Sequence, residues 1–179
     1  WTEPIFNNYI RMFKDSVFKT AMGNTFLYLL IQVPIMLVLA ILLAQLLNNK
    51  DLKFRGLFRT MIFLPCATSL VSYALIFKTL FAREGLINAI LMNIGIIKEN
   101  VNWLGTPNTA KAVIIIALLW RWTGYNMIFF LSGMQNIDPE IYESALLDGA
   151  SPRQSFFHIT LPLLKPIILF TTVTSTNGT

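Results

Sequence analysis

Hydrophobic residues in this chain run in long uncharged blocks. The first block, residues 20–49, holds 30 residues without Asp, Glu, Lys or Arg, and the second, residues 60–77, holds 18. A third block covers residues 112–134 with Arg121 as its single charge, and a fourth apolar stretch begins at Leu161. A helix needs ~20 apolar residues to cross ~30 Å of hydrocarbon, so the pattern predicts about four membrane-spanning helices.

These blocks are expected to be helices, because an open strand in lipid leaves backbone groups without hydrogen bonds. The pattern therefore predicts an all-α, polytopic membrane protein with a lead-in segment at residues 1–19 and a long connection at residues 135–162. The predicted spans lie at about residues 22–48, 57–81, 110–134 and 161–179. No Met opens the chain and the last span is still incomplete at Thr179, so we expect a fragment of a longer protein.

The composition excludes a water-soluble domain and several kinds of site. The chain is 55% hydrophobic and 13% charged, with a mean hydropathy of +0.60, whereas an ordinary soluble domain is about 25% charged. The single Cys66 excludes an intrachain disulfide, the single His158 excludes a two-histidine metal site, and no metal site is predicted. The net charge of +5 is scattered between apolar blocks, which does not favour nucleic acid as a partner.

The distribution of basic residues predicts the orientation of the chain in the membrane. The connection at residues 48–56 is short and carries the densest basic group, formed by Lys50, Lys53, Arg55 and, just inside the next helix, Arg59. The positive-inside rule places this connection in the cytoplasm. Alternation then places residues 83–111 outside and residues 135–162 back in the cytoplasm. Within the outer connection, residues 86–97 are apolar but too short to span.

Residues 138–162, named the elbow from here on, carry signals for two short helices joined by a turn. Asp138 can cap a first helix that begins at Pro139, and Ser151 can cap a second with Gln154 placed to complete a capping box. Gly149 between them permits the left-handed backbone that ends a helix. Two alternatives follow from spacing alone: a surface that docks a partner, or an amphipathic loop that lies on the membrane.

The residues of the elbow resemble those of a known protein family. Glu143-Ser144-Ala145, then Gly149, then Ile159-Thr160-Leu161-Pro162 resemble the EAA loop of permease subunits in binding-protein-dependent ABC importers, which reads Glu-Ala-Ala, Gly and Ile-x-Leu-Pro. The one departure is Ser144 for the middle Ala, a small residue for a small residue. Weaker matches to the carbohydrate branch fall in order along nearly the whole chain.

The resemblance implies a type I ABC importer transmembrane domain over residues 20–179, incomplete at its end. In that family this loop forms a coupling helix seated in a separate ATP-binding subunit, which binds ATP and Mg, so this chain is expected to hold no cofactor and no catalytic residue. The implied coupling residues are Glu143, Ser144, Ala145, Asp148, Gly149 and Ala150. The family also implies a second, usually different permease subunit, an extracytoplasmic solute-binding protein, a sugar or oligosaccharide as substrate, and the bacterial inner membrane as location.

Polar residues within the predicted spans are candidates for the substrate path. A charge at membrane depth costs about 2.5–3.5 kcal/mol and normally faces a cavity or a partner. Arg121 lies between aromatic residues, with Asn126 little more than a turn away, and aromatic rings beside polar donors suit a sugar. The candidates for the path are Arg121, Trp122, Asn126, Ser69 and Tyr73. The alternative for Arg121 is a structural role, paired with a helix carbonyl or a neighbouring subunit; for the hydroxyl groups it is bonding to their own backbone.

Other functional classes fit the sequence less well. No Gly-x-x-x-x-Gly-Lys-Ser/Thr phosphate loop is present, and no nucleophile–base pair is supported by spacing, so an enzyme is not predicted. The alternative to the ABC permease is a secondary transporter or channel subunit with no ATPase partner. That class predicts acidic relay residues in the spans, and none of the nine Asp and Glu residues lies in one.

Overall fold

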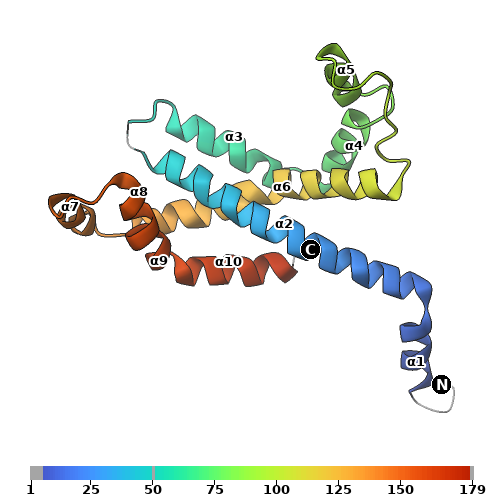
Figure 1. The fold of residues 1–179 in the computed structure, drawn as a ribbon, viewed down its shortest axis with the longest axis horizontal. Helices are drawn as coiled ribbons and strands as arrows, with labels where there is room; N and C mark the ends of the chain where they lie inside the picture. Colours follow the sequence, from blue (N-terminus) through green and yellow to red (C-terminus); the bar gives the residue numbers. More distant parts are fainter. Residues whose placement is uncertain (1–5, 50, 178–179) are drawn as a thin grey trace.

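The structure, a computed structural model, describes residues 6–49 and 51–177, and every regular element in that part of the chain is helical. The predicted all-α fold is therefore confirmed. In chain order (Figure 1) the elements are α1 (Asn7–Lys14), α2 (Ser16–Asn48), α3 (Arg55–Ala67), α4 (Leu70–Leu80), α5 (Leu86–Asn93), α6 (Pro107–Gln135), α7 (Pro139–Leu147), α8 (Pro152–Ser155), the π-helix η1 (Phe156–Thr160), α9 (Leu161–Leu163) and α10 (Lys165–Asn177).

Two long helices, α2 and α6, form the centre of the fold. They lie against each other and both run toward the end of the molecule that carries α7 (Figure 1). Ala40 and Ala44 of α2 are fully buried against Met127 and Phe130 of α6. Small residues allow membrane helices to approach closely, so this alanine pair explains why the contact forms here. Pro34 is included within α2, which continues past it.

The second helical segment is divided into α3 and α4, which are bent by 99° to each other. The break follows Pro65, whose ring cannot donate a backbone hydrogen bond, and a new helix begins where the Ser69 side chain accepts from the amide of Ser72 at 3.2 Å. α3 packs closely on α6, because Gly124 lies against the backbone of Ile62, where a Cβ would overlap the carbonyl oxygen.

The last helical segment starts within the elbow and then bends. Helical backbone runs from Pro152 through Leu163, and the following helix Lys165–Thr176 is bent by 62° to it. Pro166 explains the bend, because a proline at the start of α10 disrupts the helix that precedes it. The elbow and the predicted span at 161–179 thus overlap in one helical segment, which bends at Leu164.

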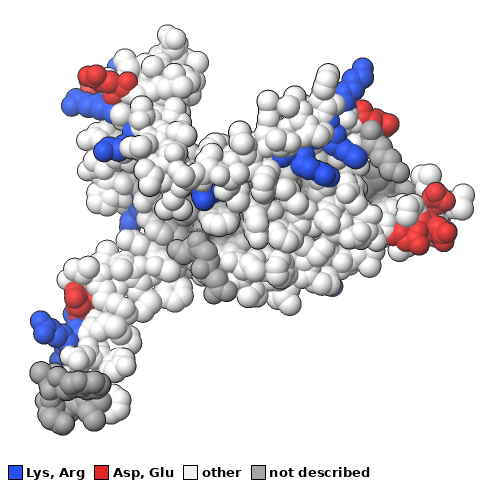
Figure 2. Space-filling model, turned by 180° about the vertical axis from the view of Figure 1, so that it is seen from behind, with Lys and Arg blue, Asp and Glu red and all other residues white. Residues whose placement is uncertain are grey.

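Two helices, α2 and α6, are long and apolar enough to cross a membrane, and the number rises to four if each bent pair is one span. The charged side chains gather mainly toward the ends of the molecule, with a largely uncharged surface between them (Figure 2). α2 begins at Ser16, earlier than the predicted span near residue 22, because the Asp15 carboxylate caps it through the Val17 amide at 2.8 Å. Residues 1–5 and Lys50 lie outside the described part of the chain.

Candidate coupling surface and polar membrane cluster

The elbow begins with α7, and its predicted cap is confirmed. The Asp138 side chain accepts a hydrogen bond from the amide of Glu140 at 3.0 Å, and Pro139 is the first helical residue. An anionic cap with an acidic first turn also suits the positive end of the helix dipole. This short helix therefore has its start fixed by local chemistry alone.

The turn after α7 is closed by a pair of backbone hydrogen bonds. The amide of Gly149 donates to Leu146 O at 3.0 Å, and the amide of Ala150 donates to Ala145 O at 2.9 Å. This pattern is a Schellman motif, which requires a left-handed residue at the position of Gly149. Its φ is +80°, as the sequence predicted. The turn reverses the chain without help from the rest of the molecule.

The second helix of the elbow starts with the predicted capping box. The Ser151 hydroxyl accepts from the Gln154 amide at 3.3 Å, while the Gln154 side chain accepts from the Ser151 amide at 2.8 Å. Both bonds satisfy backbone groups that a helix start otherwise leaves open. Helix α8 then passes directly into the π-helix η1.

One side-chain hydrogen bond ties the two arms of the elbow together. The hydroxyl groups of Tyr142 on α7 and Thr160 on η1 are 2.8 Å apart, and Thr160 is buried. A hollow of about 260 Å³ next to this bond is lined by residues of both arms and by Gln45 of α2. The bond therefore links α7 to the helical segment that leads into α9 and α10.

The outward surface of the elbow is apolar and acidic. No residue of α7 is buried, and Leu146 and Leu147 are 72% and 90% exposed. Beside them lie exposed acidic side chains, which form part of the acidic group at one end of the molecule in Figure 2. Of the six predicted coupling residues, Glu143, Ser144, Asp148 and Gly149 are exposed, and Ala145 and Ala150 are half-buried. The structure brings all six together on one short segment.

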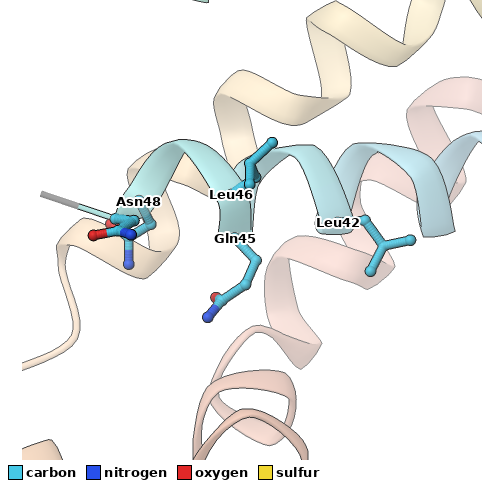
Figure 3. A pocket seen from close by; sticks show the side chains of 5 residues that line it. Leu42, Gln45, Leu46 and Asn48 are labelled. Carbon is cyan, nitrogen blue, oxygen red and sulfur yellow. The ribbon is translucent and has the colours of Figure 1, made fainter. Parts of the chain in front are cut away.

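Two further hollows surround the last turns of α2. The larger, of about 630 Å³, lies between the start of α3 and α7, and both Arg55 and Glu143 line it. The other, of about 540 Å³, is lined by residues of the last turns of α2 and by Asn49, which follows it. In Figure 3, Gln45 and Leu46 leave the helix in opposite directions, so this second hollow is an open edge of one helix.

Within the predicted third span, Arg121 is paired with a backbone carbonyl. Its Nη1 donates to Thr68 O at 3.1 Å, at the break between α3 and α4. Its guanidinium carbon also lies 5.3 Å from the Tyr73 ring centre and 5.7 Å from the Trp122 ring centre. Ser69 is exposed and serves as the cap of α4. Pairing with a helix carbonyl is the arrangement expected if Arg121 has a structural role, which was the alternative to a place in the substrate path.

A separate polar cluster lies between α2, α6 and α10. Asn126 is 1% exposed, and its amide nitrogen donates to Trp122 O at 3.0 Å and contacts the Met36 sulfur at 3.4 Å. Gln32 approaches the same sulfur at 3.8 Å. The side-chain oxygens of Gln32 and Asn126 are buried and have no hydrogen-bond partner among the described residues.

This cluster opens to a hollow of about 190 Å³, which is lined by Gln32, Met36, Trp122, Tyr125, Thr174 and Ser175. The five predicted path residues form two neighbouring groups, with Trp122 and Asn126 in this cluster and Ser69, Tyr73 and Arg121 at the α3–α4 break. The two groups meet where Arg121 lies over the Trp122 ring. From the sequence, Gln32 was expected with Pro34 to mark a kink in the first span and was not placed in the substrate path.

A buried asparagine organises the opposite end of the molecule. Residues 82–106, named the α5 cap from here on, wrap around Asn88, which is 1% exposed. Its amide nitrogen donates to Arg83 O at 3.0 Å and Val101 O at 2.8 Å, and its oxygen accepts from the Val101 amide and from Trp103 Nε1. The sequence analysis gave Asn88 no role, because its partners are far along the chain.

Comparison with known proteins identifies the family. The model for the inner membrane component of binding-protein-dependent transport systems matches residues 36–178. The chain belongs to this family. It is accordingly a multi-pass component of an inner membrane, and the fold and resemblance predicted from the sequence are confirmed.

Family members similar to this chain include transport proteins for sugars. The lactose transport system permease protein LacF of Rhizobium radiobacter is 54% identical over 172 residues, covering 96% of this chain and 58% of the relative. The arabinooligosaccharides permease protein AraP of Halalkalibacterium halodurans is 39% identical over 173 residues, covering 96% and 54%. The chain thus spans little more than half the length of these curated relatives.

Solved structures of the same family share the fold. A bacterial ABC transporter involved in the import of the acidic polysaccharide alginate gives a TM-score of 0.84 at 29% identity, covering 93% of this chain and 59% of that one. The alginate transporter in complex with an alginate pentasaccharide-bound periplasmic protein gives 0.84 at 30% identity, covering 91% and 57%.

Proposed function

We propose that the chain belongs to the permease subunit of an ATP-driven importer for a sugar or oligosaccharide. The elbow carries this proposal: it is a self-capped pair of short helices whose exposed surface holds Leu146, Leu147 and Glu143. Exposed apolar residues that are rimmed by charges mark sites of protein association. A separate ATP-binding subunit covers this surface, and the chain itself carries no catalysis.

Coupling follows from the connection between the elbow and the membrane helices. When the ATP-binding subunits close, α7 is displaced, and the Tyr142–Thr160 bond passes this displacement to the helix that continues into α10. The helices then move between outward and inward access, with ATP binding biasing the two states. Glu143, Ser144, Ala145, Asp148, Gly149 and Ala150 form the coupling surface.

The partners and substrate class are supported by the named relatives. LacF and AraP are permeases for lactose and arabinooligosaccharides, and the similar alginate transporter is solved with a sugar-loaded periplasmic protein. By analogy, a solute-binding protein delivers the sugar to the end of the molecule that carries the α5 cap. A second permease subunit completes the path.

The test is a charge reversal within α7 of the full-length protein, co-expressed with its partner subunits. Glu143→Lys is expected to release the ATP-binding subunit during purification, or to leave ATP hydrolysis without stimulation by sugar in vesicles. Glu140→Lys is the matched control, because the same charge change on the same helix lies outside the coupling motif. Sugar uptake that continues without any ATP-binding subunit contradicts the proposal and supports a secondary transporter.

For the substrate path we place Trp122 and Asn126 at the sugar, together with Gln32. Their cluster presents two buried, unpartnered amide oxygens and an indole ring beside a hollow. Sugar hydroxyl groups donate hydrogen bonds to such oxygens, and the C–H face of the ring stacks on indole. Leaving buried acceptors unsatisfied costs about 1–3 kcal/mol each, which a bound hydroxyl recovers.

Arg121, Tyr73 and Ser69 are assigned a positioning role in this proposal. They hold the α3–α4 break, where the Thr68 carbonyl accepts from Arg121. Gln32→Leu and Trp122→Ala are expected to raise the KM for sugar uptake at least tenfold, whereas Arg121→Lys lowers the maximal rate and leaves the KM in place. Unchanged kinetics in Gln32→Leu and Trp122→Ala contradict the assigned path.

A further inference from the structure

Met36 of α2 lies between the two amide side chains of the polar cluster. The Asn126 amide nitrogen is 3.4 Å from the Met36 sulfur, and the Gln32 amide nitrogen is 3.8 Å from it. Met36 is 0% exposed, and it lines the hollow of about 190 Å³ together with Gln32 and Trp122. The thioether sulfur is therefore an acceptor that both amides share.

The orientation of the Asn126 amide is fixed by its own helix. The Trp122 carbonyl oxygen, 3.0 Å away, can only accept, so the NH₂ end of the amide faces it. An NH₂ group has two N–H donors, and the second is left for the Met36 sulfur. The Asn126 oxygen has no partner in the part of the chain that the structure describes. Both donors of Asn126 are thus occupied, while its acceptor is open.

A methionine suits a contact that has to be broken. Its sulfur is a weak hydrogen-bond acceptor, and its unbranched side chain has three rotatable bonds. One and two turns further along the same face of α2, Ala40 and Ala44 pack against Met127 and Phe130 of α6. The two helices are therefore held together beyond the cluster, and the Met36 side chain can move without separating them.

The hollow beside Met36 is small for a sugar. Its volume of about 190 Å³ lies below the ~300–1,000 Å³ of pockets that enclose small-molecule ligands. Among the described residues that line it, Met36 is the one whose side chain carries no amide, hydroxyl or indole group. Displacement of this side chain enlarges the hollow and at the same time releases the N–H donors of the two amides.

We propose that Met36 is an internal ligand of the Gln32 and Asn126 amides, which the sugar displaces when it binds. This inference rests on the proposed place of the cluster in the substrate path. A sugar hydroxyl group both donates and accepts, so it replaces the sulfur as acceptor and also supplies the donor that the amide oxygens lack. Met36 thereby sets the affinity of the site, because the sugar competes with it for the amides.

Two substitutions of Met36 are expected to change the sugar affinity in opposite directions. Met36→Leu keeps the apolar volume and removes the acceptor, so the affinity should rise about fivefold, the equivalent of one net hydrogen bond. Met36→Gln keeps the unbranched shape and supplies a carbonyl oxygen, which is a stronger acceptor than sulfur, so the affinity should fall about fivefold. If Met36 only filled space, both variants would loosen the packing and change the affinity in the same direction.

The experiment uses the full-length permease subunits assembled with their ATP-binding subunits and purified in detergent without nucleotide. The solute-binding protein is left out, so that the measured affinity belongs to the permease subunits. Lactose and an arabinooligosaccharide, the sugars in the names of the two relatives, are titrated by calorimetry. Met127→Leu is the matched control, because it makes the same change at a side chain of α6 that is also 0% exposed, and it should leave the affinity unchanged.

Tighter binding in Met36→Leu with weaker binding in Met36→Gln supports the proposal. Unchanged or weaker binding in Met36→Leu overturns it, and this conservative variant suffices even if Met36→Gln fails to assemble. Gln32→Leu separates this failure from that of the proposed path. If Gln32→Leu weakens binding while Met36→Leu changes nothing, the cluster binds sugar and only the role of Met36 is wrong. If Gln32→Leu also binds normally, or if the unmodified transporter binds neither sugar, the proposed path and the role of Met36 are both overturned.

Discussion

The α5 cap and the elbow are both short helical excursions from the same pair of long helices, yet they are stabilised in opposite ways. The cap is built around one buried side chain, Asn88, whose hydrogen bonds reach two segments of the chain, at Arg83 and at Val101 and Trp103. The elbow has no buried residue in α7 and is held by caps at its helix ends and by one hydroxyl pair. The cap is thus held by one buried side chain and the elbow by its helix ends, although both expose apolar side chains, among them Ile96 in the cap and Leu147 in the elbow.

The largest effect is expected from Asn88→Ala, which breaks the centre of the α5 cap. The partly buried amide of Val101 and the Trp103 indole lose their acceptor, and hydrogen bonds of about 1 kcal/mol each are removed. We expect a loss of roughly 3 kcal/mol in the local stability of the cap, seen as faster hydrogen exchange at residues 94–106 with the elbow unchanged. Asn93→Ala, at an exposed position of the same helix, is the control. Equal protection of residues 94–106 from hydrogen exchange in the two variants would contradict the role of Asn88 as the centre of the cap.

Gly149→Ala is expected to have the next largest effect, confined to the elbow. A Cβ at a φ of +80° is strained although no atom lies within 4 Å of it, which costs about 1–2 kcal/mol. Hydrogen exchange at the Ala150 amide reports the loss of the Schellman motif. Gly56→Ala, also in open space but without a positive φ, is the matched control and should be neutral or stabilising. Unchanged hydrogen exchange at the Ala150 amide in Gly149→Ala would show that contacts other than the Schellman motif hold the turn.

Tyr142→Phe removes the single bond between the two arms of the elbow. We expect a loss of about 1 kcal/mol, measured as faster exchange in residues 156–163, together with weaker stimulation of ATP hydrolysis by sugar. Tyr28→Phe on α2 is a suitable control, because no hydrogen bond of its hydroxyl is found in the described part of the chain. Full coupling in Tyr142→Phe would mean that displacement reaches α10 by another contact.

Leu147→Ser is expected to have the smallest effect on stability and a clear effect on assembly. The side chain is 90% exposed, so the isolated subunit loses nothing when it is replaced. Burial of a Leu side chain against a partner is worth about 1.5–3 kcal/mol, so affinity for the ATP-binding subunit should fall at least ~10-fold. Ile96→Ser, an exposed position of the α5 cap, should leave that affinity unchanged. Loss of affinity in Ile96→Ser with full affinity in Leu147→Ser would place the partner surface on the α5 cap and not on the elbow.

Features that depend on neighbouring residues were predictable from the sequence. The caps at Asp138 and Ser151 and the left-handed Gly149 follow from rules that act within a few residues, and all are confirmed. Length and hydropathy likewise predicted the helical membrane fold. The coupling residues stay a prediction, placed together by the structure on one exposed segment.

Features that depend on distant partners were not predictable. Asn88 bonds to residues 13 and 15 positions away, and Arg121 bonds to a carbonyl 53 positions away. Both polar residues could be recognised in the sequence, but the segments that they contact in the fold could not. The 99° bend between α3 and α4 was likewise not predicted. Gln32 was visible as an amide in the first block, and only the approach of α6 brings Asn126 to the same Met36 sulfur.

The π-helix at Phe156–Thr160 determines how the side chains that follow it are rotated about the helix axis relative to those of the elbow. A π turn holds one residue more than an α turn, so every side chain after it is rotated by roughly 100° from where a regular helix would place it. Deleting one residue from this turn would leave the amino-acid types almost unchanged and yet point the wrong face of α10 toward α6.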